Sequence, residues 1–175
     1  RIPVDALKPV ATGFDDDAPE WTDTAVLLGA LGRRTTPEEI ERVSPFRFAA
    51  PLSPDMAARR ERRKLDFGEL LEFSRRAVQN HEGQMLIEGV GGIMVPLDAR
   101  RTVLDWMTAL GIPIVLVVGG YLGTISHTLT ARDVLSQRGL KIAAIVVSEN
   151  ERDTVALEDT VESITRFSQG VEVIG

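Results

Sequence analysis

The sequence contains no cysteine and no long apolar run. The absence of cysteine excludes disulfide bonds and thiolate metal sites. The longest apolar stretch, Ile112–Val118, contains a proline and falls far short of the roughly 20 residues that span a bilayer. No charged and apolar leader opens the chain. These features predict a cytoplasmic protein that does not enter a membrane.

The sequence also lacks an excess of positive charge. The formal net charge is −6, whereas a protein that binds duplex nucleic acid presents a basic face. One basic cluster, within Arg59–Lys64, is best interpreted as a solvated helix end and loop. Nucleic acid is therefore not an expected partner. The length of 175 residues suits one domain with its own core.

Apolar segments alternate with helical patterns along the chain. Continuous apolar runs are typical of buried parallel strands. They occupy Gln84–Glu88, Ile112–Val118 and Lys141–Val147, with Val4–Val10 and Val171–Ile174 as weaker candidates. Helices are predicted at Thr22–Leu31, Pro37–Arg42, Ser53–Arg60, Asp66–Asn80, Thr102–Leu110, Thr124–Gln137 and Asp153–Phe167. The alternation predicts a single α/β domain over residues 1–175, with a parallel sheet flanked by helices.

Ligands of such sheets bind beyond the carboxyl ends of the strands. Glu88 follows one predicted strand and opens the turn Glu88–Gly92. A carboxylate there suits Mg²⁺, and the glycines allow backbone amides to approach phosphate oxygens. A tight turn with a solvated glutamate is the alternative.

Two further candidates lie near the start of the chain. Lys8 could neutralise a phosphate or a carbamate, and Thr12 could donate from its hydroxyl group. An ordinary surface lysine before a proline is the alternative. Asp23 opens a predicted helix, where an aspartate usually interacts with the helix dipole; it could also be a second Mg²⁺ carboxylate.

Two strand-to-helix or loop-to-helix junctions could receive an anion. Ser53 occupies an expected N-cap position, which would leave helix amides available to an anion. Gly119–Thr124 presents amides in the same way and suits a carboxylate, because it lacks the lysine and spacing of a P-loop. His81 and His127 have no spaced metal-binding partner, so we assign them structural or surface roles.

The order of the motifs points to a family. KPVATG, PFRFAAPLSPDMAAR, LIEGVGGIMVPLD and IPIVLVVGGYLGTISHTLTA follow one another between Lys8 and about Val147. This arrangement resembles dethiobiotin synthetase. The resemblance implies a P-loop NTPase-like, three-layer αβα fold and a homodimer. It also implies conversion of 7,8-diaminononanoate, CO₂ (or bicarbonate) and Mg-ATP to dethiobiotin, ADP and phosphate.

Position by position, the resemblance implies a role for each matching residue. Lys8 matches the active-site lysine, and Asp23 and Glu88 match the carboxylates that bind Mg²⁺. The implied substrate contacts are Thr12, Ser53, Leu122, Gly123 and Thr124. The implied nucleotide contacts are Asp23, Glu88, Gly89, Val90, Gly91, Ser148 and Glu149.

The sequence departs from the family pattern in several places. The P-loop motif GxxxxGK[ST] occurs nowhere in it, so we expect the given chain to be truncated at its N-terminus and the full-length protein to be active. The family's base-binding region continues beyond the position of Gly175, so we also expect truncation at the C-terminus. Ser148-Glu149-Asn150 stands where many members have a base-contacting asparagine, and Tyr121 where some have lysine. Two alternatives stay open: a P-loop-less relative that binds a small anion, and a related ATP-dependent amide-forming synthetase.

Overall fold

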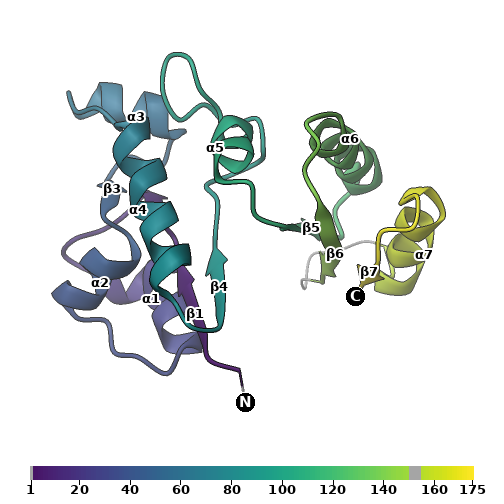
Figure 1. The fold of residues 1–175 in the computed structure, drawn as a ribbon, viewed down its shortest axis with the longest axis horizontal. Coiled ribbons are helices and arrows are strands. Elements are labelled where there is room, and N and C mark those ends of the chain that lie inside the picture. The colour runs from purple at the N-terminus through teal and green to yellow at the C-terminus, as the bar shows by residue number, and fades with distance from the viewer. Residues whose placement is uncertain (1, 150–154) are drawn as a thin grey trace. The chain divides into compact units, whose positions relative to one another are not determined.

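The computed structural model describes residues 2–149 and 155–175. The chain forms two compact units, residues 1–110 and residues 111–175. Each unit is built from parallel strands with helices packed beside them (Figure 1).

Unit 1 contains four short strands in two parallel pairs. The strands are β1 (Val4–Leu7), β2 (Val10–Thr12), β3 (Phe46–Phe48) and β4 (Gln84–Ile87). β1 pairs with β4, and β2 pairs with β3. The helices are the 3₁₀ turn η1 (Pro19–Trp21), α1 (Asp23–Ala30), α2 (Pro37–Val43), α3 (Pro54–Arg60), α4 (Phe67–Asn80) and α5 (Val103–Leu110).

Pro9 divides the first predicted strand into β1 and β2. Proline has no N–H to donate to a sheet, and the chain changes its partner at this residue. The Lys8 amide donates to the Val43 carbonyl (3.1 Å), and the Pro9 carbonyl accepts from the Phe46 amide (3.0 Å). The prediction of one strand over Val4–Val10 was therefore wrong at Lys8 and Pro9, and β3 was not predicted.

Two apolar clusters form the core of unit 1. The larger one includes Val10, Phe48, Leu70 and Trp106, and the second is centred on Leu7, Leu28 and Val43. The strands contribute to both clusters, as expected for an α/β unit whose sheet is covered by helices. These clusters fix the strand ends that carry the candidate site.

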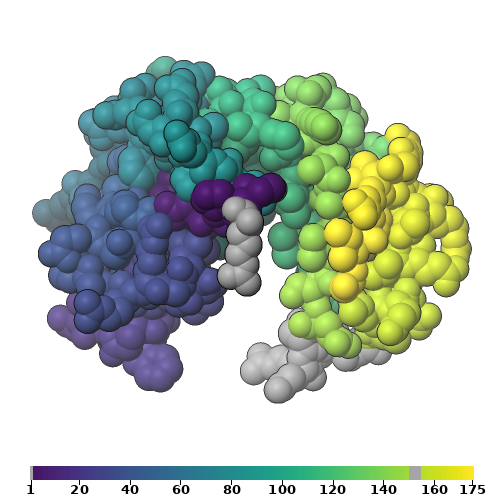
Figure 2. All heavy atoms as spheres, turned by 60° about the horizontal axis from the view of Figure 1, so that its bottom comes forward, coloured from purple at the N-terminus to yellow at the C-terminus, as the bar shows by residue number. Residues whose placement is uncertain are grey.

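Unit 2 is a three-stranded parallel sheet with two helices. Its strands are β5 (Ile114–Gly119), β6 (Ile142–Ser148) and β7 (Val173–Ile174), in that order across the sheet. Its helices are α6 (Thr124–Gln137) and α7 (Leu157–Phe167). Leu116, Ile145, Val147 and Ile164 are buried together. In Figure 2 the yellow C-terminal segment lies against the light-green atoms of β6.

Two predicted strands are buried on one face only within their own unit. Leu86 of β4 is 55% exposed, and Val115 and Val117 of β5 are 50% and 63% exposed. Continuous apolarity had predicted burial of both faces. Alternate side chains point to opposite faces of a strand, and within each unit the packing covers only one of them.

The predicted fold class is confirmed: the protein is α/β, with parallel strands flanked by helices. The predicted helix Asp153–Phe167 begins at Leu157 in the described residues, and Asp153 lies outside them. Among the helices that the structure describes, none has the length and apolar character to cross a membrane.

Candidate functional site

Lys8 lies directly after β1 and connects two acidic side chains. Its Nζ is 2.5 Å from Glu88 Oε1 and 3.4 Å from Asp23 Oδ2. The same ammonium group lies 3.4 Å from the Gly89 carbonyl oxygen. Lys8 is buried while both carboxylates are exposed. The three side chains that the sequence singled out at strand and helix ends therefore meet at one place in unit 1.

The strand register brings Lys8 and Glu88 together. In the parallel pair β1–β4, Leu7 lies opposite Ile87, and the Glu88 amide donates to the Leu7 carbonyl (2.8 Å). The next residues on both strands thus leave the same edge of the sheet, where parallel folds bind ligands. Asp23 reaches this edge from the first position of α1.

The turn after Glu88 depends on glycine at Gly91. Its φ of +65° is favourable only for glycine among common residues. A Cβ at this position would lie 2.9 Å from Val95 Cγ2. Val90 is buried and fixes the middle of the turn in the core. The backbone from Glu88 to Gly91 is thus held close to Lys8 without a bulky side chain over it.

Thr12 and Ser53 lie on segments that contact each other in unit 1. Thr12 ends β2, and the next amide, that of Gly13, donates to the Ala50 carbonyl (3.1 Å). Ser53 occupies the N-cap position of α3, but its hydroxyl group donates to Asp55 Oδ1 (2.6 Å). The prediction that the Ser53 side chain caps the helix was therefore wrong, because Asp55 offers a charged acceptor two residues away.

The acidic pair fits a magnesium ion. Mg²⁺ commonly takes one or two protein carboxylates and completes its shell with water and phosphate oxygens. Asp23 and Glu88 provide two such groups around one point, and their side chains are 74% and 54% exposed. Within residues 2–149 and 155–175, no group of three or more His, Cys, Asp or Glu side chains could enclose a metal by itself.

In unit 2 the loop before α6 surrounds a separate hollow. It has a volume of about 420 Å³ and is lined by Leu122, Gly123 and Thr124 among others. Thr124 is 4% exposed, and its hydroxyl oxygen is buried without a hydrogen-bond partner. Gly123 has φ +97° and precedes the 14-residue helix α6. A buried hydroxyl group and a helix N-terminus favour an anion here.

A contact in this loop escaped the sequence interpretation. The Tyr121 hydroxyl group and His127 Nδ1 are 2.9 Å apart, and their rings are in contact. His127 had been assigned a structural or surface role, and the bond shows that it holds Tyr121 beside the loop. Tyr121 lies in the loop before α6 and His127 lies within α6, so no single helix or strand period relates them and the sequence gives no signal for the pair.

The last predicted nucleotide contacts lie at the end of β6. Ser148 is the final residue of that strand and pairs with Gly119 of β5. Glu149 follows it and is exposed. Asn150 lies outside the described residues. Leu122, Gly123, Thr124, Ser148 and Glu149 all belong to unit 2, whereas the Lys8 site belongs to unit 1.

Comparison with known proteins places these features in a class. A family model described as "AAA domain" matches residues 3–175, so the chain is a nucleotide-binding α/β protein of the P-loop NTPase type. A protein of Acidiphilium cryptum is 48% identical over 166 residues, covering 94% of this chain and 74% of the relative. Proteins of Caulobacter vibrioides and Methylobacterium nodulans are 47% and 45% identical, with 99% and 98% of this chain and 78% of each relative covered.

All three relatives are named ATP-dependent dethiobiotin synthetase. The chain belongs to the dethiobiotin synthetase family. It is therefore an enzyme of the ATP-dependent ligase class, connected with biotin synthesis, as the motif order predicted.

Proposed function

We propose that the protein closes the ureido ring of dethiobiotin from 7,8-diaminononanoate, CO₂ and Mg-ATP. The observation that carries this proposal is the meeting of Lys8 with Asp23 and Glu88 at the edge of the sheet. One buried ammonium group beside two exposed carboxylates suits a reaction in which anionic oxygens develop next to a metal-bound nucleotide.

The proposed reaction has three balanced steps. One amine of the substrate adds to CO₂ and loses a proton, which gives a carbamate. A carbamate oxygen attacks the γ-phosphate, which forms a carbamic–phosphoric anhydride and releases ADP. The second amine then attacks the carbonyl carbon, expels phosphate and loses a proton, which closes the ring. Negative charge accumulates on the carbamate and phosphate oxygens in the first two steps.

Lys8 would face this negative charge. Its stem is buried, and the ammonium group is aimed at the acidic edge by the Glu88 and Gly89 contacts. Phosphoryl transfer depends mainly on positioning and on cations near the transferring group. In this role Lys8 orients the carbamate and offsets the developing charge, while Thr12 and Ser53 contact the substrate nearby.

Asp23 and Glu88 would hold the Mg²⁺ that accompanies ATP. When bound, the ion supplies a positive charge that polarises phosphate oxygens. The turn Glu88–Gly91 presents backbone close to the nucleotide phosphates. Ser148 and Glu149 would contact the nucleotide base.

The loop Leu122–Thr124 would bind the substrate carboxylate in a homodimer. Support comes from the buried, unpartnered Thr124 hydroxyl group in the hollow before α6. A carboxylate oxygen would accept from this group and from amides of the helix N-terminus. The partner subunit's copy of the loop would then complete the Lys8 site.

The decisive experiment supplies the complete protein encoded by the gene with diaminononanoate, bicarbonate and Mg-ATP. We expect dethiobiotin by mass spectrometry, with one ADP formed per product molecule. Omission of bicarbonate should stop both products. ADP release without dethiobiotin would point instead to an amide-forming synthetase with another substrate.

A second candidate function, which the sequence interpretation left open, is the binding of a small anion at the Lys8 site without catalysis. Equilibrium dialysis with radiolabelled ATP and with phosphate discriminates between the two functions. Phosphate binding without ATP binding by the complete protein would favour the non-catalytic function.

A further inference from the structure

Unit 1 contains a second hollow, toward the opposite ends of β1 and β4 from the Lys8 site. It has a volume of about 410 Å³, which is within the range of small-molecule sites. Asp5 of β1 and Met85 of β4, which pair with each other, lie at this hollow. The residues that line the hollow include Leu7 but not Lys8, Asp23 or Glu88. The hollow is therefore distinct from the proposed reaction site.

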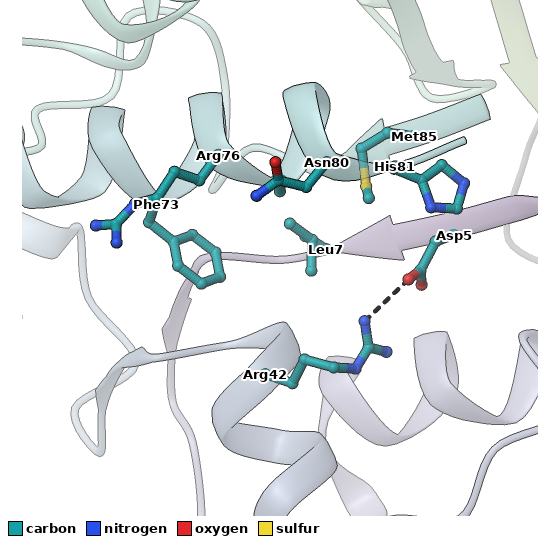
Figure 3. A pocket seen from close by; sticks show the side chains of 9 residues that line it. Asp5, Leu7, Arg42, Phe73, Arg76, Asn80, His81 and Met85 are labelled. Atoms are coloured by element: carbon teal, nitrogen blue, oxygen red, sulfur yellow. Dashed lines mark hydrogen bonds and ion pairs between the residues drawn. The ribbon is translucent and has the colours of Figure 1, made fainter. Parts of the chain in front are cut away.

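One side of this hollow is apolar. Leu7 projects into it from β1, Met85 comes from β4, and Phe73 and Ala77 come from α4 (Figure 3). Leu7 belongs to the second core cluster, and the other three pack against that cluster. The apolar wall is thus fixed by the core of unit 1 and suits the hydrocarbon part of a ligand.

The other side of the hollow carries an ion-pair network. Asp5 is 8% exposed, and its Oδ2 accepts from Arg42 Nη1 at 3.0 Å. Arg42 also donates from Nε to Glu39 Oε2 (2.9 Å). Arg33 Nη1 lies 3.4 Å from Asp5 Oδ1 and 3.5 Å from Glu39 Oε2. Two arginines and two carboxylates balance each other, so the network carries no net charge.

Two nitrogen atoms beside this network are buried and have no partner. They are Arg42 Nη2 and His81 Nε2. Figure 3 shows the Arg42 and His81 side chains approaching Asp5 from two sides. A buried N–H group without an acceptor loses the hydrogen bond that it makes to water. An acceptor inside the hollow would satisfy both nitrogens.

The charges select the kind of acceptor. Asp5 Oδ1 already accepts from the Ala6 amide and Oδ2 from Arg42, so a ligand cation would find these acceptors in use. Arg76 also lies at the hollow, and Glu72 on the surface of α4 balances its charge. The groups without a partner are therefore donors, and the carboxylate that lines the hollow, Asp5, is already paired.

We propose that this hollow binds a small carboxylate that carries an apolar body. The carboxylate accepts hydrogen bonds from Arg42 Nη2 and from His81 in its Nε2–H form. The hydrocarbon part lies on Leu7, Phe73 and Met85. Charge-assisted hydrogen bonds of this kind are stronger than neutral ones, so the site favours a carboxylate over an amide of the same shape.

Histidine resonances provide a direct test, because the chain has only two histidines. The probe is phenylacetate, titrated into protein labelled with ¹⁵N-histidine, and phenylacetamide is the uncharged comparison. We expect a saturable shift of the His81 Nε2 resonance with phenylacetate and a dissociation constant about tenfold higher for phenylacetamide. Equal affinity for the two compounds would overturn the proposal. A response of His127 in unit 2 without one of His81 would overturn it as well.

The variant Arg42→Lys tests the role of Arg42 Nη2, the nitrogen without a hydrogen-bond partner. Lysine keeps a positive charge beside Asp5 and Glu39 but has a single terminal nitrogen and no counterpart of Nη2, so phenylacetate should bind about tenfold more weakly. Arg75→Lys on α4 is the matched control, because Arg75 donates to the Ala109 carbonyl and does not line the hollow. Unchanged affinity in a folded Arg42→Lys protein would overturn the proposal.

A second variant covers the case in which Arg42→Lys does not fold. His81→Phe removes both ring nitrogens and keeps an aromatic ring at the end of α4. Binding is then followed through the amide resonances of Ala77 and Met85. A loss of affinity of about tenfold supports the proposal, and wild-type affinity overturns it.

Discussion

At the scale of single residues, Lys8 combines burial with charge. Lys8→Ala in the complete protein should lower kcat by about 10²–10³-fold, as expected for loss of one preorganised electrostatic group. Lys8→Met should lose as much activity while keeping the apolar stem packed. Lys64→Ala, at an exposed lysine, is the control. Dethiobiotin formation measures the effect, and wild-type turnover in Lys8→Met would remove the ammonium group from the mechanism.

Glu88 allows the metal assignment to be tested. Glu88→Gln should shift the Mg²⁺ dependence of turnover to concentrations about tenfold higher, because a neutral amide is a weaker ligand for a hard cation. Glu82→Gln, at an exposed residue before β4, should leave the dependence unchanged. Activity titrated against MgCl₂ at fixed ATP gives the comparison. An unaltered curve for Glu88→Gln would exclude Glu88 as a metal ligand.

Some contacts of the candidate site could be predicted from the sequence, and others could not. Glu88 ends a predicted strand, so its place at the ligand-binding edge followed from the rule for parallel sheets. Lys8 lies within the predicted strand Val4–Val10, and its place beside Glu88 depends on the pairing of β1 with β4. The Ser53 hydroxyl bond to Asp55 and the Tyr121 bond to His127 depend on local rotamers and loop paths. Neither is encoded by a period in the sequence. Burial of the Thr124 hydroxyl group without a hydrogen-bond partner likewise has no signal in the sequence.

At the scale of elements, long helices were predicted well and short strands poorly. α6 has the predicted bounds, and α4 differs by its first residue, Asp66, which caps the helix by accepting from the Gly68 and Glu69 amides. β3 has three residues, too few for a hydrophobic period to appear. The division between β1 and β2 follows from Pro9, whose ring removes one donor.

The start of β4 depends on Gly83. Its φ is +133°, and a Cβ there would lie 2.3 Å from the Pro3 carbonyl oxygen, which accepts from the Gln84 amide. Gly83→Ala should therefore destabilise the protein by more than about 1 kcal/mol. Urea unfolding followed by circular dichroism measures this change.

Gly29→Ala is the matched control for Gly83→Ala. Gly29 lies within α1, and an added Cβ there meets nothing within 4 Å. Alanine is the better helix former, so the free energy of unfolding should rise by about 0.4–1 kcal/mol. Equal effects of the two substitutions would contradict the explanation by backbone conformation.

At the scale of the whole molecule, we propose that the chain behaves as the single domain that the sequence predicts. A single domain unfolds in one cooperative transition. Both tryptophans, Trp21 and Trp106, lie in unit 1, and His127 lies in unit 2. Urea midpoints from tryptophan fluorescence and from the His127 resonance should therefore coincide. An earlier loss of the His127 signal would show that unit 2 is a separate domain.

The change of partner at Pro9 makes the position of Lys8 depend on a neighbouring connection. The main chain on both sides of the Lys8–Pro9 bond is attached to the connection between α2 and β3, through Val43 and Phe46. An insertion or deletion in that connection would change the direction of the Lys8 side chain without replacing any residue of the Lys8 site. Changes of length between residues 43 and 46 should therefore lower turnover even where the core contacts of Val43 are kept.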